Sequence, residues 1–243
     1  MVRLSDLHIG DVKKIDWSAY FEENSRHRLE IDFSKENGLS ENEKRMIFPS
    51  IQRFQIGEAS KGWFLLKCAK HYAEKENAPE YFEAMKWFVR EENCHSAYLK
   101  KYMDYYNVPV RKGSALDWIF RFLRKTWGLK SEVTVLVTAE MIALSYYSAL
   151  AQCAVSPALK SICEQMLHDE LRHIVFQSMT LHKLKINSLE NMLRIILMEV
   201  TLLVVWSSMK DVFGAGGYTF RRFATDSLGY LRQSIKISKN GEL

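Results

Sequence analysis

The segment HDELRHIVFQ, residues 168–177, carries several ionisable side chains in the middle of what otherwise has the pattern of a buried helix. Glu170 and His173 are three residues apart, so they share one face of a helix, and the apolar residues Ile162 and Met166 lie on that same face. An unpaired charge in a low-dielectric interior is costly. This segment therefore either turns its polar side to water or meets a positive charge inside the fold.

The same pattern occurs again in the segment REENCH, residues 90–95. Glu92 and His95 repeat the three-residue spacing, and apolar residues from Met85 to Met103 keep the phase of this pair. A helix that turned its polar side to water would not show this phase, because its apolar residues would lie opposite the charged ones. Both Glu-x-x-His pairs are therefore predicted to face the core.

Two further acids stand alone in apolar helical segments. Glu58 is in phase with Ile51 and Phe54, and Glu140 is the only acid in VTVLVTAEMIALSYYSAL, residues 133–150. Acids are rarely buried without a partner. Two helices are thus expected to supply one glutamate each and two to supply a Glu-x-x-His pair, which is the ligand arrangement of di-iron carboxylate bundles.

Four carboxylates and two imidazoles suit divalent iron or manganese better than zinc, whose structural sites prefer thiolates. The four negative charges would neutralise two divalent cations, which makes the buried acids tolerable. The alternative is a polar core in which these groups satisfy one another without metal. The predicted ligands are Glu58, Glu92, His95, Glu140, Glu170 and His173.

The ligand spacing predicts an all-α fold with a long crossover. The outer gaps, 92 − 58 = 34 and 170 − 140 = 30 residues, fit neighbouring antiparallel helices, while the middle gap of 140 − 92 = 48 leaves room for a short amphipathic helix at 114–128. Ser40 and Glu43 fit a capping box, and Pro49 is expected to kink the helix that follows or to mark its true start. The other helices are expected at 40–75, 79–106, 131–154, 157–184, 188–213 and 219–236.

Domain organisation and location follow from composition. We expect an N-terminal arm over 1–39 with one short helix, in which 27–33 could be extended, and a single domain over 40–243. The net charge of +5 is too small to indicate nucleic-acid binding. No CxxC pair and no signal peptide are present, so we expect a cytoplasmic protein. The most apolar stretch, 192–206, contains Arg194 and Glu199 and is short for a bilayer, so it is predicted to be a buried core helix rather than a membrane span.

These motifs resemble those of the ferritin-like, ribonucleotide-reductase-type di-iron proteins. DELRH looks like the second iron motif of the bacterial multicomponent monooxygenases, and EENCH with DELRH is similar to the pair in acyl carrier protein desaturases. LVTAEMIALSYY with HDELRH resembles stretches of the cyanobacterial aldehyde-deformylating oxygenases, and the aromatic-amine N-oxygenases share the ligand pattern. The resemblance spans residues 40–185 and implies a ferritin-like four-helix bundle with extra C-terminal helices.

The resemblance also implies a role for each ligand. One metal ion would take a terminal glutamate and a histidine, the second ion would take another such pair, and two further glutamates would bridge both ions. In this sequence those are, in order, Glu58 with His95, Glu140 with His173, and the bridging Glu92 and Glu170. Asp169 would orient His95 through a hydrogen bond, and Glu91 could do the same for His173.

Four other residues lie near the motifs or in the apolar segment that follows them. Tyr147 shares the face of Glu140, so it could line a substrate pocket or carry a radical, although packing with a hydroxyl partner is the simpler interpretation. Glu199 could add a ligand or face the surface. His168 should point away from the centre. Met166 stands where the N-oxygenases carry an extra histidine, so a seventh ligand from that position is absent.

The resemblance favours an O2-dependent non-haem di-iron oxygenase or oxidase acting on a small, largely apolar organic substrate. No flavin, haem or iron–sulfur motif is present, so an external electron donor such as a reductase or ferredoxin is expected. The cofactors would be two iron ions, with manganese as an alternative at one or both positions, and a homodimer is compatible with the sequence. The alternatives are a peroxide- or iron-handling protein and a bundle that binds a ligand or partner without turnover.

Overall fold

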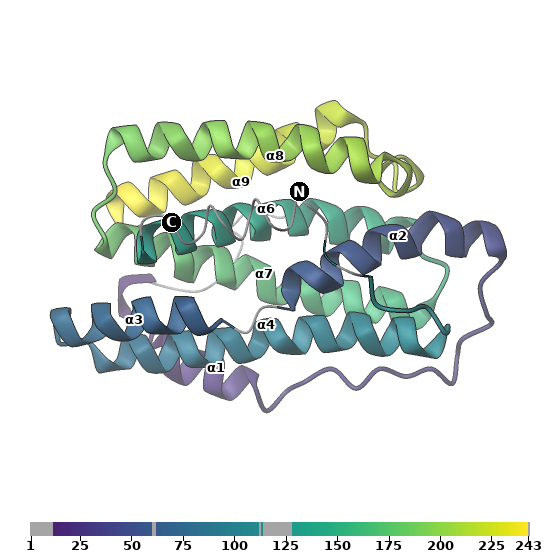
Figure 1. The fold of residues 1–243 in the computed structure, drawn as a ribbon, viewed down its shortest axis with the longest axis horizontal. Coiled ribbons are helices and arrows are strands. Elements are labelled where there is room, and N and C mark those ends of the chain that lie inside the picture. Colours follow the sequence, from purple (N-terminus) through teal and green to yellow (C-terminus); the bar gives the residue numbers. More distant parts are fainter. Residues whose placement is uncertain (1–11, 60–61, 112, 114–127, 243) are drawn as a thin grey trace.

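The computed structural model describes residues 12–59, 62–111, 113 and 128–242, and every regular element within them is helical (Figure 1). This agrees with the predicted all-α class. The predicted amphipathic helix at 114–128 lies outside the described residues except for its last position, and 27–33 contains no strand. The elements are a short 3-10 helix at Val12–Lys14 and α-helices α1 (Trp17–Asn24), α2 (Glu41–Glu58), α3 (Trp63–Glu76), α4 (Pro79–Tyr105), α6 (Leu129–Cys153), α7 (Pro157–Lys183), α8 (Ser188–Ala215) and α9 (Phe220–Asn240).

The prediction of a single helix over 40–75 is wrong, because the helical backbone is interrupted between α2 and α3. The predicted capping box of Ser40 and Glu43 does start α2, and Pro49 lies inside this helix rather than at its start. α2 then ends at Glu58, and α3 begins after Gly62, which adopts a left-handed backbone with φ of 59°. A Cβ on that glycine would lie 2.5 Å from Cγ1 of Val89 on α4, so only glycine allows this close approach.

The helices that carry the predicted ligands surround a shared core. α2 and α3 lie along α4, α6 lies along α7, and α4 also contacts α7. Local signals start these helices: Pro79 opens α4, and Ser156 caps α7 by accepting from the amide of Leu159. The arm also contributes to this core, because α1 packs on α4 and buries Phe21 almost completely.

The C-terminal helices form an outer layer. α8 lies over α6, and α9 lies over α7 and α6 (Figure 1). Both α6 and α8 are long and apolar enough to cross a membrane by length and composition. The two helices differ in burial: 78% of the most apolar 18-residue segment of α6 is buried within the protein, against 28% of that of α8. The prediction that 192–206 forms a buried core helix is therefore wrong, because one whole side of α8 faces outward.

Candidate metal centre

The two Glu-x-x-His pairs meet in the core between α4 and α7. α4 supplies Glu92 and His95, and α7 supplies Glu170 and His173. All four residues are buried, and one ligand atom from each lies within 4.8 Å of every other. The predicted phase of both helices is thus confirmed by the structure, since each pair points inward.

Both imidazole rings turn Nδ1 toward the carboxylates. His173 Nδ1 lies 2.9 Å from Glu92 Oε1 and 3.2 Å from Glu170 Oε2. His95 Nδ1 lies 3.4 Å from Glu170 Oε1 and 3.8 Å from Glu92 Oε1. Nδ1 is therefore the nitrogen that each ring can offer to a metal ion, while Nε2 points away from the cluster.

Three of these inward-facing atoms lie near an oppositely charged group but in a direction that makes no hydrogen bond. They are Glu92 Oε1, Glu170 Oε1 and His95 Nδ1, and all three are buried. Most buried polar atoms in native proteins are hydrogen-bonded, so three such atoms around one point require an explanation. A cation between them would accept a lone pair from each, so this donor set fits a metal ion.

The remaining predicted ligands lie beside this cluster. Glu140 on α6 is buried, with Oε2 3.6 Å from His173 Nδ1, and its Oε1 accepts a hydrogen bond of 2.8 Å from Gln177 Nε2. Glu58 is the last residue of α2, and its Oε1 accepts a hydrogen bond of 3.0 Å from the hydroxyl of Tyr147. That hydroxyl partner is the packing role expected for Tyr147.

Electrostatics around the cluster reflect an excess of negative charge. Burial alone would lower the pKa of His95 and His173, but the surrounding carboxylates raise the pKa of each imidazole well above its ordinary value. Burial and the nearby charges of Glu92 and Glu170 raise the pKa of Glu58 well above its usual range. A region that both attracts protons to imidazole and resists a further carboxylate charge is suited to divalent cations.

Two carboxylates hold the outer nitrogens of the rings in a crossed arrangement. Asp169 on α7 contacts the ring from α4, with Oδ2 3.1 Å from His95 Nε2. Glu91 on α4 contacts the ring from α7, with Oε2 2.8 Å from His173 Nε2. These are the contacts expected from the resemblance. In the neutral imidazole that binds a metal ion, each carboxylate favours the tautomer in which Nε2 carries the proton, which leaves the Nδ1 lone pair facing the centre.

Asn24, the last residue of α1, joins these two carboxylates, and sequence reasoning missed it. Its Nδ2 donates to Glu91 Oε1 and, over 3.2 Å, to Asp169 Oδ1. It lies 67 residues from one partner and 145 from the other, inside an arm whose sequence is polar and irregular. No local sequence signal could have assigned this contact.

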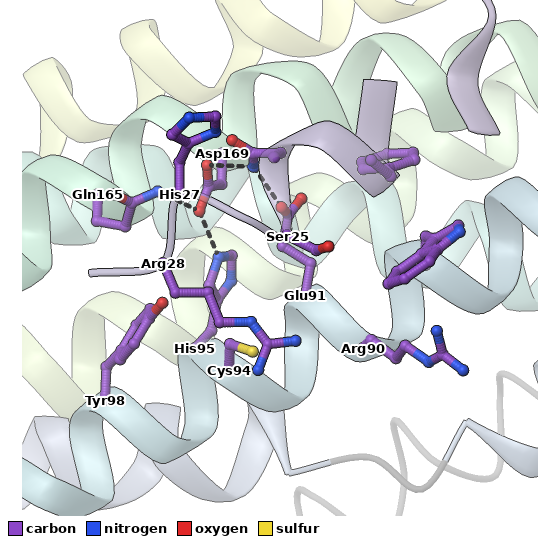
Figure 2. Close-up of a pocket in the computed structure, with 13 residues that line it drawn as sticks. Ser25, His27, Arg28, Arg90, Glu91, Cys94, His95, Tyr98, Gln165 and Asp169 are labelled. Atoms are coloured by element: carbon purple, nitrogen blue, oxygen red, sulfur yellow. Dashed lines mark hydrogen bonds and ion pairs between the residues drawn. The ribbon is translucent and has the colours of Figure 1, made fainter. Parts of the chain in front are cut away.

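A small recess opens on this outer side of the centre (Figure 2). It holds little enclosed space, and His95 and Asp169 are among the side chains that line it. The rest of its lining mixes charged side chains with aromatic rings; these are Arg28, Arg90, Glu91, Phe21, Trp87 and Tyr98. The recess lies on the Nε2 side of His95.

Aromatic rings cover the side of His173 that faces away from the acids. The Phe88 ring packs edge-on against the imidazole with centroids 4.8 Å apart, and the Phe21 ring lies 5.9 Å away. Phe176 packs against both phenylalanines. This apolar wall excludes water from the ring and strengthens the electrostatic interactions inside the cluster.

The other residues considered from the sequence lie outside the cluster. Glu199 is exposed on α8, so its interpretation as an added ligand is wrong. His168 is half-exposed, as expected, and its Nδ1 lies 2.9 Å from Asp169 Oδ1. Met166 is fully buried and packs in the core.

Comparison with known proteins finds no match: no family model matches the chain, and neither does any curated protein or solved structure. What can be said of this protein therefore depends on its structure. It defines an all-helical protein with a buried cluster of two glutamates and two histidines that could hold a metal ion.

Proposed function

We propose that this chain is a ferritin-like, non-haem di-iron oxygenase or oxidase that uses O2 to oxidise a small, largely apolar organic substrate. The observation that carries this proposal is the convergence of two Glu-x-x-His pairs, three of whose inward atoms make no hydrogen bond. This ligand arrangement is the one that di-iron carboxylate bundles use. The proposal extends the four-residue cluster to six ligands and two ions.

Six residues would hold the two ions: Glu58, Glu92, His95, Glu140, Glu170 and His173. When bound, two reduced iron ions would supply the electrons for the first reduction of O2, which the side chains of the protein cannot do themselves. Because the described residues include no cofactor-binding motif, further electrons would come from an external reductase or ferredoxin-type donor.

The side chains around the ligands have two tasks in this proposal. The first is orientation: Glu91 and Asp169 hold the histidines, Gln177 holds Glu140, and Tyr147 holds Glu58 through the contacts described above. The second task is to exclude water, which the phenylalanine wall beside His173 performs.

An apolar substrate is supported by the residues toward α2 and α6. Beside the Glu58–Tyr147 hydrogen bond, Phe54 stacks on Tyr146 with ring centroids 3.7 Å apart, and it also packs against Tyr147. These rings offer hydrophobic contact next to the proposed ligands, whereas the recess near His95 is lined in part by the charged side chains of Arg28, Arg90 and Asp169. We expect an apolar substrate to approach from the α2 and α6 side.

The first test is anaerobic titration with Fe(II), followed by O2 uptake in the presence of a chemical reductant. We expect two Fe(II) per chain and O2 consumption above that of free iron. Glu170→Gln should lose iron binding, while Glu164→Gln, an exposed acid on the same helix, should behave as the native chain. Failure to bind iron, or binding without any O2 consumption, would refute the oxygenase assignment. Consumption of peroxide in preference to O2 would instead favour peroxide and iron handling.

A further inference from the structure

The outer face of α8 is apolar along four turns of helix. Its exposed large hydrophobic residues recur from the first turn to the fourth, and each retains 40% to 62% of its accessible surface. The one exposed charged residue within residues 189–203 is Glu199. We call this surface the α8 stripe, and it consists of Leu189, Met192, Leu193, Ile195, Ile196, Val200 and Leu203.

The inner face of α8 is unusually polar, which fixes the stripe outward. Asn191, Arg194 and Thr201 are all buried there. The guanidinium of Arg194 donates to Ser234 Oγ at 2.5 Å and to Ser238 Oγ at 3.1 Å, both on α9. Rotating α8 to bury the stripe would break these hydrogen bonds and leave polar groups unpaired. The exposed apolar surface is therefore a stable feature of the fold.

The size of the stripe exceeds what a monomer usually exposes. Taking roughly 180 Å² for a fully exposed aliphatic residue, the seven residues present about 630 Å², against roughly 300–600 Å² for the largest apolar patch of a typical monomer. Two such surfaces together would bury at most about 1,300 Å², near the lower end of the roughly 1,200–2,000 Å² of stable specific interfaces. The area is sufficient for association with a second copy.

We propose that the α8 stripe is the interface of a homodimer, in which α8 packs antiparallel against α8 of a second copy with the two-fold axis at Ile196. Leu189, Leu193, Ile196, Val200 and Leu203 follow one another at steps of four, three, four and three residues. This is the 3.5-residue repeat of paired helices that interlock side chains. The repeat ends before the kink at Met209, so it lies on regular helix.

The stripe is close to symmetric about Ile196, which favours the antiparallel arrangement. With the two-fold axis at Ile196, residues level with each other in the two chains have numbers that sum to 2 × 196 = 392. Leu189 of one chain therefore meets Leu203 of the other, and Met192 meets Val200. Glu199 is then level with Leu193 and remains at the edge of the interface. In a parallel pair Glu199 of one chain would lie level with Glu199 of the other chain. The two like charges would then be close together and would repel.

Charge also favours a second copy over a lipid surface. Helices that lie on membranes carry lysines and arginines beside their apolar face, and anionic lipids attract those side chains. Here the exposed charge within the stripe is the carboxylate of Glu199. A dimer interface with a polar rim accommodates this residue, whereas an anionic bilayer would repel it.

The first test measures mass by light scattering or sedimentation over a range of concentrations. The native chain should be a dimer. Val200→Glu should raise the dimer dissociation constant by at least about 100-fold, because each two-fold interface would then bury two carboxylates without partners. Val155→Glu is the matched control, since Val155 has 56% exposure against 53% for Val200 and lies off the stripe. It should remain dimeric, and circular dichroism should show that both variants are folded.

The second test establishes the geometry by oxidative cross-linking. Ile196→Cys should form a disulfide-linked dimer, whereas the native cysteines and Val155→Cys should not. A mixture of Leu189→Cys and Leu203→Cys chains should cross-link more than either variant alone, because the antiparallel register brings these positions together.

Three results would overturn the proposal. The first is a native chain that stays monomeric at high micromolar concentration. The second is a dimer that the Val200→Glu substitution leaves intact. The third is a parallel cross-linking pattern, in which the Leu189→Cys cysteines of two chains form a disulfide with each other. Flotation with phosphatidylserine vesicles covers the other occupant. Binding of a monomer to vesicles that Val200→Glu abolishes would assign the stripe to a membrane and refute the dimer.

Discussion

Asp169→Asn is the sharpest test of how the second layer of residues supports the metal centre. Four donors converge on this carboxylate: Asn24 Nδ2 at 3.2 Å, Gln165 Nε2 at 2.8 Å, His168 Nδ1 at 2.9 Å and His95 Nε2 at 3.1 Å. Burial would raise the pKa of Asp169, but these contacts lower it well below its usual range, so it is anionic at neutral pH. The substitution keeps the shape of the side chain and replaces one acceptor oxygen by a donor.

The loss of stability expected for Asp169→Asn follows from the number of donors that the carboxylate accepts. Whichever way the new amide points, its NH2 group faces two donors and cannot accept from them. Hydrogen bonds to charged groups contribute roughly 1.5–3 kcal/mol each, so losing two of them should lower the free energy of unfolding by about 3–6 kcal/mol. At about 2–4 °C per kcal/mol for a chain of this length, Tm should fall by about 6–24 °C.

Metal binding should weaken as well, because in either orientation of the amide His95 loses the anionic acceptor that orients its ring. Residues that orient metal ligands typically contribute roughly 10–100-fold to metal affinity, and we expect a loss in that range. The assay is competition of protein and a chromophoric chelator for Mn(II), together with thermal unfolding in the absence of metal. Glu164→Gln is the control, since that acid is exposed on the same helix. A variant with native Tm and a Mn(II) affinity within about threefold of native would refute the reasoning.

Three further substitutions test other contacts. Asn24→Ala should weaken Mn(II) binding by about 10-fold, because Asn24 donates to both carboxylates that hold the histidines. Ser25→Ala should not, because the Ser25 hydroxyl donates to the backbone oxygen of Glu22 instead. Equal affinities of the two variants in a chelator competition would contradict a role for α1. Gly62→Ala should cost about 1–3 kcal/mol in urea unfolding, since it combines a positive φ with a contact of 2.5 Å to a buried valine; native stability would show that the α2–α3 break tolerates a Cβ. Tyr147→Phe should cost about 1–2 kcal/mol and retain the fold, because the Glu58 carboxyl loses its donor; loss of helical circular dichroism would show that the hydroxyl has a larger structural role.

The sequence by itself determined the local features of this protein. Helix type follows from periodicity over a dozen residues, and helix starts follow from caps such as Ser40 with Glu43. The three-residue spacing within each Glu-x-x-His pair fixes one face of one helix, and the apolar phase shows that this face is inward. For these reasons the residue pattern alone identifies the four side chains that the fold brings together, Glu92, His95, Glu170 and His173.

Only the tertiary structure decided how distant segments meet. The break after Glu58 depends on a close approach between Gly62 and Val89, which periodicity cannot reveal because both helices keep the same phase. The link from Asn24 to Glu91 depends on where α1 docks on α4.

The orientation of α8 shows the same limit in its clearest form. Apolar composition predicted that this helix is buried, but the hydroxyls of α9 hold its polar face inward through Arg194 and leave its aliphatic side exposed. Composition measures how much apolar surface a helix carries. Which face is buried depends on the partners that other segments provide, and those partners are set by long-range packing rather than by the local sequence.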